Sequence, residues 1–432
     1  MSEQTVRELA ERYWNGEADL VHEHHPVHSP GPNAAEELDD GLLYIKSIAS
    51  VSTLDTGDGL VMLDTGSFFD VNRVYDSVRG WRSSTPLAAA VYSHHHVDHV
   101  FGTKRFEEEA STNGWDGPVV YAHEELPHHF DRYVKTAGWN GAINSRQFGL
   151  GLVDLEWPTE YRKPDVTYAD HTSFSRGDLT FELRHARGET DDATWTWVPE
   201  RKILHPGDLF IWAVPNAGNP QKVQRYLSDW ATALREMAAL GPETMLAGHG
   251  LPIFGRDRIV AALTDTADLL DAIESQTIEL MNQGKPLDEV IHSVEVPARL
   301  RDKPYLRPVY DHPQFLVRNV WRRYGGWYDG EPDNLLPAPR AQQAREWVTL
   351  AGGVEPVLAR ARALMAADDL RVACHLVEFA VLAEPQSEEV HAVRAELYRA
   401  RSAQQESSMA RNILAHAALS SEQGLRDHAG RY

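Results

Sequence analysis

The chain has 432 residues, of which 64 are Asp or Glu and 42 are Lys or Arg, so its formal net charge at pH 7 is −22. A surface of that sign repels the phosphates of nucleic acids and the anionic lipids of membranes, so we expect a partner of neither kind. Hydrophobic residues make up 42% of the chain, which is typical of a globular protein, and the one cysteine excludes a disulfide framework and a cysteine-based zinc cluster.

The first 40 residues are expected to form a helix and an arm. Val6, Leu9 and Tyr13 recur at helical spacing within residues 2–15. The segment begins with polar residues and lacks the apolar core of a secretion signal, and no later apolar run reaches the length of a transmembrane helix. We therefore expect a cytoplasmic protein.

Alternating strands and helices are predicted from residue 41 to about residue 260. An apolar strand ending at Asp64 is followed by a helix at about 70–80 and by a second apolar strand ending at Tyr92. This alternation indicates an α/β domain in which polar side chains follow the ends of apolar strands.

The pattern changes after residue 260, where apolar residues recur only at helical spacing. We expect an all-α domain over residues 261–432, because no further strands are predicted there. Its last part reads as stacked helical hairpins over residues 355–366, 369–383, 387–402 and 406–418.

The strongest chemical signal is the run from Ser93 to His99, which follows an apolar strand. His94 and His96 are two residues apart, so their side chains project to the same side of an extended turn. Asp98 and His99 come next. Nitrogen and oxygen ligands at this spacing suit one zinc-like ion on the first pair and a second ion on the last pair. The alternative is a polar loop with solvated histidines, which the preceding strand disfavours.

Three later strand ends supply more ligand-type side chains. Glu189, Asp208 and His249 each follow an apolar strand and a glycine, which lets the backbone approach a metal cluster closely. One such end would be weak evidence, since Gly-Asp is a common turn, but three after a histidine motif favour a metal site. Asp64 fits a carboxylate that orients a ligand histidine, with a simple strand-end turn as the alternative.

These motifs resemble the metallo-β-lactamase superfamily and, within it, the alkylsulfatase branch. Glu189 stands where most of the superfamily has a histidine, and residues 317–335 are similar to the dimerisation signature of the branch. The resemblance extends over about residues 40–425. It implies an α/β fold, namely an αβ/βα sandwich over residues 41–260, followed by the helical dimerisation domain of a homodimer or larger assembly. The sterol-carrier-like third domain of long alkylsulfatases is not expected, since the chain stops at Tyr432.

The resemblance also implies a metal-ligand set. It places His94, His96 and Glu189 on one metal, Asp98, His99 and His249 on a second, and Asp208 between them, although the branch tends to have glutamate near this last point. Asp98 and Asp208 are the implied catalytic residues, and His95 has no ligand role. We expect two zinc ions per chain, with Mn or Fe also compatible with these ligands.

The segment that corresponds to sulfate recognition departs from the branch, because its first arginine is absent. The expected anion contacts are Asn216, Asn219, Lys222 and Arg225, together with Arg146 from an earlier insert. This insert, residues 121–151, could form a lid over the site or a surface helix.

The sequence thus predicts a zinc-dependent hydrolase that cleaves a small organic sulfate ester. A dinuclear zinc pair lowers the pKa of a bound water toward neutrality, which provides a metal-bound hydroxide as the nucleophile. One alternative is a hydrolase of the same fold acting on a phosphodiester, lactone or thioester. A second is a non-catalytic interaction protein, which the complete ligand set disfavours.

Overall fold

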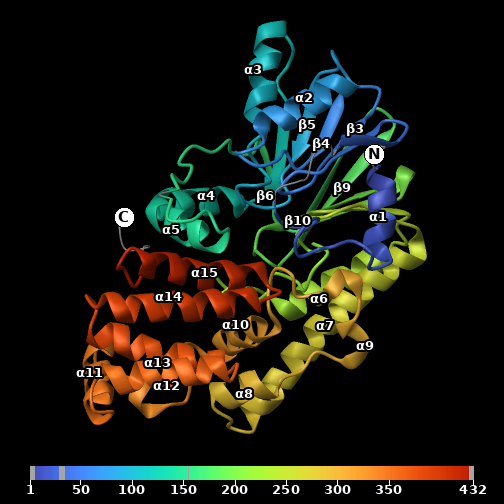
Figure 1. Cartoon of the computed structure of the whole chain (residues 1–432). Coiled ribbons are helices and arrows are strands. Elements are labelled where there is room, and N and C mark those ends of the chain that lie inside the picture. Colours follow the sequence, from blue (N-terminus) through green and yellow to red (C-terminus); the bar gives the residue numbers. More distant parts are fainter. Residues whose placement is uncertain (1–4, 29–34, 154, 428–432) are drawn as a thin grey trace. The chain divides into compact units, whose positions relative to one another are not determined.

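The computed structural model describes residues 5–28, 35–153 and 155–427, so residues 2–4 of the predicted helix and 29–34 of the arm lie outside it. By its internal contacts the chain forms two compact units (Figure 1). The first comprises residues 1–135, 158–285 and 289–324, and the second comprises residues 136–157, 286–288 and 325–432. Because residue 260 lies inside the first unit, these units divide the chain differently from the predicted domains, whose boundaries stay a prediction.

The first unit contains two β-sheets. In the first sheet the strands lie in chain order: β1 (Ala35–Asp39), β2 (Leu42–Ile45), β3 (Val51–Asp55), β4 (Leu60–Leu63), β5 (Leu87–Val91), β6 (Val119–His123) and β7 (Val166–Tyr168). β1 to β4 pair antiparallel, whereas β4 to β7 pair parallel. The second sheet contains β8 (His171–Arg176), β9 (Leu179–Ala186), β10 (Ala193–Val198), β11 (Ile203–Gly207), β12 (Thr244–Ala247) and β13 (Ile253–Phe254). All its neighbours are antiparallel except β11 and β12.

Apart from the helix over residues 137–147, the α-helices up to residue 325 are α1 (Val6–Trp14), α2 (Val71–Trp81), α3 (Thr103–Asn113), α4 (Leu126–Lys135), α6 (Leu227–Ala239), α7 (Arg256–Asn282), α8 (Leu287–Ser293), α9 (Ala298–Arg301) and α10 (Pro313–Gly325). Val74 and Val78 of α2 and Phe106 of α3 pack with Met62 of β4 in one buried core, which holds both helices against the first sheet (Figure 1). α6 contacts β9, and α7 contacts β12, so helices also cover the second sheet.

Parallel strand pairing brings the polar strand ends together, because the carboxyl ends of adjacent parallel strands meet at one edge. β4 ends before Asp64, and β5 ends before the turn that begins at Ser93. Gly207 at the end of β11 has φ +53°, and a Cβ there would lie 2.7 Å from Ser93 Cβ, so this approach of the two sheets requires glycine.

The second unit is helical. It contains α5 (Ala137–Gln147), α11 (Arg340–Leu350), α12 (Val354–Ala366), α13 (Leu370–Ala383), α14 (Glu388–Ala403) and α15 (Ser408–Glu422), of which α12 to α15 closely follow the predicted hairpins. Ala373, Val377 and Leu397 belong to its buried core. Buried Arg394 donates to Glu378 at 2.7 Å, which supplies the opposite charge that an arginine needs inside a protein.

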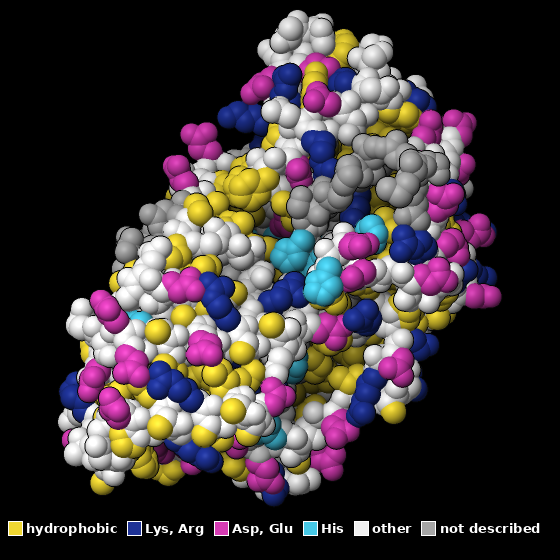
Figure 2. Space-filling view, in the orientation of Figure 1, with side chains coloured by type: hydrophobic (Ala, Val, Ile, Leu, Met, Phe, Trp, Pro, Cys, Tyr) yellow, Lys and Arg dark blue, Asp and Glu magenta, His cyan; other side chains and the backbone are white. Residues whose placement is uncertain are grey.

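Charged side chains of both signs are visible on one face of the molecule (Figure 2). Figure 2 shows acidic and basic side chains interspersed over the face drawn, without a large area of one sign. In the part of the chain that the structure describes, no helix combines the length and the apolar character that crossing a bilayer demands.

The core of the second unit gives a stability prediction. Leu397 is 0% exposed, so Leu397→Ala should lower the free energy of unfolding by about 2–5 kcal/mol through lost burial and a cavity. Leu336 is 92% exposed and serves as the matched control, with an expected change within about 0.5 kcal/mol for Leu336→Ala. Urea titration followed by circular dichroism measures both. Equal effects of the two substitutions would contradict the packing described.

Candidate metal centre

The turn after β5 brings the predicted ligands of the first metal together. His94 Nε2 lies 2.8 Å from His96 Nδ1 and 3.8 Å from Asp208 Oδ2. Glu189, which follows β9, places Oε1 3.6 Å from His96 Nδ1. All four side chains face one another in the interior of the first unit.

The predicted ligands of the second metal form an adjacent group. His249 Nε2 lies 3.4 Å from Asp98 Oδ2 and 3.2 Å from Asp208 Oδ2. His99 Nε2 lies 3.8 Å from Asp98 Oδ2 and 3.4 Å from Asp208 Oδ1. Asp208 thus has close neighbours in both groups, which is the position that a bridging carboxylate requires.

The two groups fit divalent cations. Ligand atoms that each lie about 2 Å from one ion are separated from one another by roughly 3–4 Å. The distances above are in this range, except that His94 Nε2 and His96 Nδ1 are closer, at 2.8 Å. His99 Nε2, Glu189 Oε2 and Asp208 Oδ1 are buried and have no hydrogen-bond partner among the described residues. Since buried polar atoms normally have a partner, bound metal would complete their coordination.

The electrostatics of the centre also favour cations. Burial lowers the pKa of His94 to about 3 and that of His96 well below its ordinary value, so both rings are neutral and able to coordinate. Burial and the neighbouring Asp208 raise the pKa of Glu189 well above its usual range. A carboxylate that resists ionisation for these reasons gains most from a nearby cation.

Asp64 and a backbone carbonyl orient the ligand histidines. Asp64 is completely buried, and its Oδ2 accepts a hydrogen bond from His99 Nδ1 at 2.7 Å. Its other oxygen accepts one from the Ser93 backbone N–H at 2.7 Å. His249 Nδ1 donates to the carbonyl of Ile48 at 2.5 Å. In both rings Nε2 is left to face the cluster, which supports the predicted orienting role of Asp64.

His95 belongs to a separate network beside the centre. Its backbone N–H and its Nδ1 donate to the two oxygens of buried Asp192, at 3.0 and 2.9 Å. Arg132 of α4 donates to His95 Nε2 at 2.9 Å, and the His129 ring stacks on His95 with centroids 4.2 Å apart. Both ring nitrogens of His95 thus have hydrogen-bond partners, Asp192 at Nδ1 and Arg132 at Nε2. His95 is therefore not a metal ligand in this arrangement.

Two of the predicted anion contacts lie against Glu189. Asn216 Nδ2 donates to Glu189 Oε1, and Arg225 Nη2 lies 3.5 Å from the same oxygen. Arg225 is 1% exposed, and among the described residues no group accepts a hydrogen bond from its Nε, Nη1 or Nη2. Burial and the charge of Arg225 lower the pKa of half-buried Lys222 to about 7, while Asp98 and Glu189 oppose that shift.

The other two predicted anion contacts have different surroundings. Arg146 belongs to the second unit, where its Nη1 donates to Asp427 at 3.1 Å. Asn219 is buried, and its side-chain oxygen accepts from the Gln221 backbone at 3.1 Å, so it shapes a turn. The substrate roles of both residues stay predictions.

Arg132 and Asn319 were not predicted from the sequence. Arg132 bonds to His95, beside the metal ligands, and Asn319 bonds to the backbone of Arg225. Arg132 lies in the insert that begins at Tyr121, but no spacing there separates it from an ordinary helical arginine. Asn319 lies in the segment that resembles a dimerisation signature, yet its side chain bonds to the backbone of Arg225. No local pattern in the sequence connects the segment that contains Asn319 with the loop that carries Arg225.

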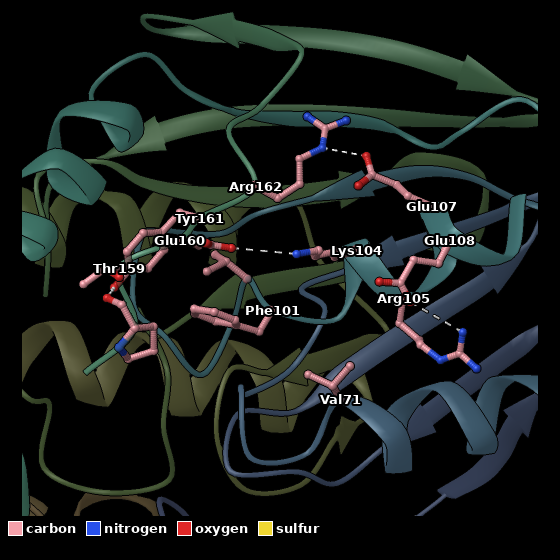
Figure 3. A pocket seen from close by; sticks show the side chains of 12 residues that line it. Val71, Phe101, Lys104, Arg105, Glu107, Glu108, Thr159, Glu160, Tyr161 and Arg162 are labelled. Carbon is pink, nitrogen blue, oxygen red and sulfur yellow. Dashed lines mark hydrogen bonds and ion pairs between the residues drawn. The ribbon is translucent and has the colours of Figure 1, made fainter. Parts of the chain in front are cut away.

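A cavity of about 660 Å³ opens elsewhere in the first unit (Figure 3). Phe101 and Tyr161 give it an aromatic wall, and its charged side chains pair with one another. Lys104 lies 3.9 Å from Glu160, and Arg162 donates to Glu107 at 2.7 Å, as the dashed lines show. None of the predicted metal ligands lines this cavity, so it is distinct from the metal centre.

Two parts of this chain match known protein families. Residues 47–249 match the family model described as metallo-beta-lactamase superfamily, and residues 286–424 match the one described as alkyl sulfatase dimerisation. The chain is 27% identical over 368 residues to a linear primary-alkylsulfatase of Pseudomonas sp. (strain ATCC 19151), a match that covers 80% of this chain and 69% of that protein. It is 25% identical over 407 residues to an (R)-specific secondary-alkylsulfatase of Pseudomonas sp, covering 89% of this chain and 61% of that one.

A solved structure shows the same fold. The stereoselective inverting sec-alkylsulfatase Pisa1 from Pseudomonas sp. has a TM-score of 0.83 and 24% identity, and the match covers 91% of this chain and 66% of that one. This likeness confirms the predicted fold class, a sandwich followed by a helical region. The chain spans between 61% and 69% of the length of these relatives.

The position of Asp208 gives a prediction about metal content. Protein purified without chelator should contain two divalent ions per chain, and Asp208→Asn should reduce this to one or none because a shared ligand is weakened. Glu182→Gln changes a β9 carboxylate paired with Arg184, outside both ligand groups, and should retain both ions. Elemental analysis measures all three proteins. One ion or none in the unmodified protein would refute the dinuclear site.

Proposed function

We propose that this chain, which belongs to the alkylsulfatase branch of the metallo-β-lactamase superfamily, hydrolyses organic sulfate esters at its metal centre. The relatives named above are alkylsulfatases by name, and that activity is transferred here as a proposal. Zinc as the metal, two ions per chain and a cytoplasmic location are parts of the proposal that rest on the sequence.

The observation that carries the proposal is the buried guanidinium of Arg225. It lies 3.5 Å from the predicted metal ligand Glu189 and finds no hydrogen-bond acceptor among the described residues. Burying a charge costs several kcal/mol unless it is paired and hydrogen-bonded. An anionic head group beside the metals would accept from Arg225, and a planar guanidinium suits the paired oxygens of a sulfate.

The residues of this chain then have distinct roles. Divalent ions held by the two ligand groups would supply an activated water and would neutralise charge that develops on the ester. Asp64 holds His99 by a hydrogen bond, and Asp208 joins the two groups. Arg225 and Lys222 would bind and orient the sulfate oxygens, while Asn216 fixes the carboxylate of Glu189.

The second candidate function is hydrolysis of an ester other than a sulfate. The stretch around Lys222 lacks the arginine that the resemblance leads us to expect, and Lys222 acts as a point charge that a phosphate or carboxylate also satisfies. Esters of one alcohol with different acids therefore separate the two candidates.

The ester test compares kcat/KM for the sulfate, phosphate and carboxylate esters of one alcohol. We expect the sulfate ester to be the best substrate. Arg225→Ala should lower its kcat/KM roughly 10- to 100-fold, which corresponds to the loss of a charge-assisted hydrogen bond, and Arg225→Lys should lower it less. The neutral carboxylate ester should respond weakly to both variants. If sulfate is not the best of the three esters, the sulfatase proposal fails.

The second unit motivates a prediction about assembly. Trp347 and Leu350 of α11 are 59% and 78% exposed, and Trp327 is 72% exposed. Because these large apolar side chains lie within the range matched by the dimerisation family, we propose a homodimer. Sedimentation equilibrium at micromolar concentration should give twice the chain mass of 48.5 kDa. A mass equal to that of one chain would contradict the proposal.

A further inference from the structure

The backbone that carries Lys222 and Arg225 is bound to α10. Asn319, which is 4% exposed, accepts a hydrogen bond from the Arg225 N–H at 3.3 Å and donates to the Arg225 carbonyl at 3.1 Å. One side chain thus holds both polar groups of the Arg225 peptide backbone. An amide is suited to this task because it contains a donor and an acceptor side by side.

A second side chain of α10 extends the same connection. Arg322 Nη1 donates to the Lys222 carbonyl at 3.3 Å, and its Nε donates to the Gln224 side chain at 3.1 Å. Its Nη2 donates to Asn319 Oδ1 at 3.0 Å, so Arg322 also supports the amide that holds Arg225. Together, Asn319 and Arg322 form what we call the α10 clamp.

The other end of the loop is attached to the segment that leads into α10. Buried Asp311 accepts a hydrogen bond from the Gly218 N–H at 2.7 Å. Gly218 also lies close to the start of α10, where a Cβ on it would be 2.2 Å from the backbone nitrogen of Leu316. The loop that carries Asn216 and Arg225 is therefore held at both ends by the same part of the chain.

This attachment determines where the Arg225 guanidinium is held. Among the described residues no hydrogen-bond acceptor fixes its nitrogens, so its position depends on the backbone and on packing. An arginine loses side-chain conformational entropy when it is ordered. A backbone fixed in advance reduces what ligand binding must order, which raises affinity for the anion.

We propose that Asn319 and Arg322 are positioning residues that place Arg225 for binding an anionic sulfate-type group beside Glu189. This inference rests on the proposed function, because it assumes that Arg225 contacts the head group. It gives α10 a role in the site, although α10 lies within residues 286–424, the range matched by the dimerisation family. By its contacts α10 up to Tyr324 belongs to the first unit.

The test is a double-mutant cycle on the metal-loaded full chain, with inorganic sulfate as the probe and calorimetric Kd as the readout. Asn319→Ala should weaken sulfate binding roughly 3- to 10-fold in the unmodified protein. In the Arg225→Ala background it should have no further effect, because Asn319 acts through Arg225. Arg318→Ala, at an exposed position of the same helix, is the control and should leave the Kd unchanged.

Two substitutions of Arg322 provide a separate test in case Asn319→Ala prevents folding. Arg322→Gln should weaken sulfate binding, and Arg322→Lys should restore part of it, with metal content and the unfolding midpoint retained in both. Equal effects of Asn319→Ala with and without Arg225, or no effect of either clamp variant, would overturn the inference. If Arg225→Ala itself leaves the Kd unchanged, the head-group contact in the proposed function is what fails.

Discussion

The burial of two carboxylates, Glu189 and Asp208, beside a third that is half-buried, Asp98, is the constraint on which the first unit depends. The three side chains converge on one site, where like charges repel and burial penalises the ionised form of Glu189. The raised pKa of Glu189, caused first by burial and then by Asp208, expresses this cost. Such a cluster is stable only with positive charge among its members. Divalent cations would meet that requirement, with the histidine rings as neutral ligands; without them, Asp208 raises the pKa of His99 and His249, which favours protonated rings there.

The fold meets the constraint by joining strand ends that are distant in the sequence. Asp64 connects the end of β4 to the turn after β5, and Thr194 N–H donates to the Ser93 carbonyl at 2.6 Å, which ties the second sheet to the same turn. Outside the ligand groups, α10 fixes the loop that presents Arg225. The metal ligands and the cationic side of the site are thus supported by different parts of one unit, and they meet at Glu189, which Asn216 and Arg225 both contact.

Local patterns explain which parts were predictable. The His94–His99 spacing and the glycine-bearing strand ends are short-range signals, and the structure brings together every ligand that they indicate. The apolar periodicity of the C-terminal helices placed α12 and α13 within one or two residues of their ends. By contrast, the bonds between Asn319 and Arg225 join residues 94 positions apart, and those between His95 and Asp192 span 97. The prediction for Arg146 depended on its charge and on its place in an insert between two metal motifs, and neither reveals which unit holds the side chain.

In the proposed site, Asp208 joins two metal sites beside an anion-binding arginine. Anomalous diffraction at the absorption edge of the bound metal, from crystals grown with inorganic sulfate, tests this arrangement most directly. The account predicts two anomalous peaks, one among His94, His96 and Glu189 and one among Asp98, His99 and His249, with sulfate bonded to Arg225. A single peak, or a peak at His95 and Asp192 in place of these two, would contradict it.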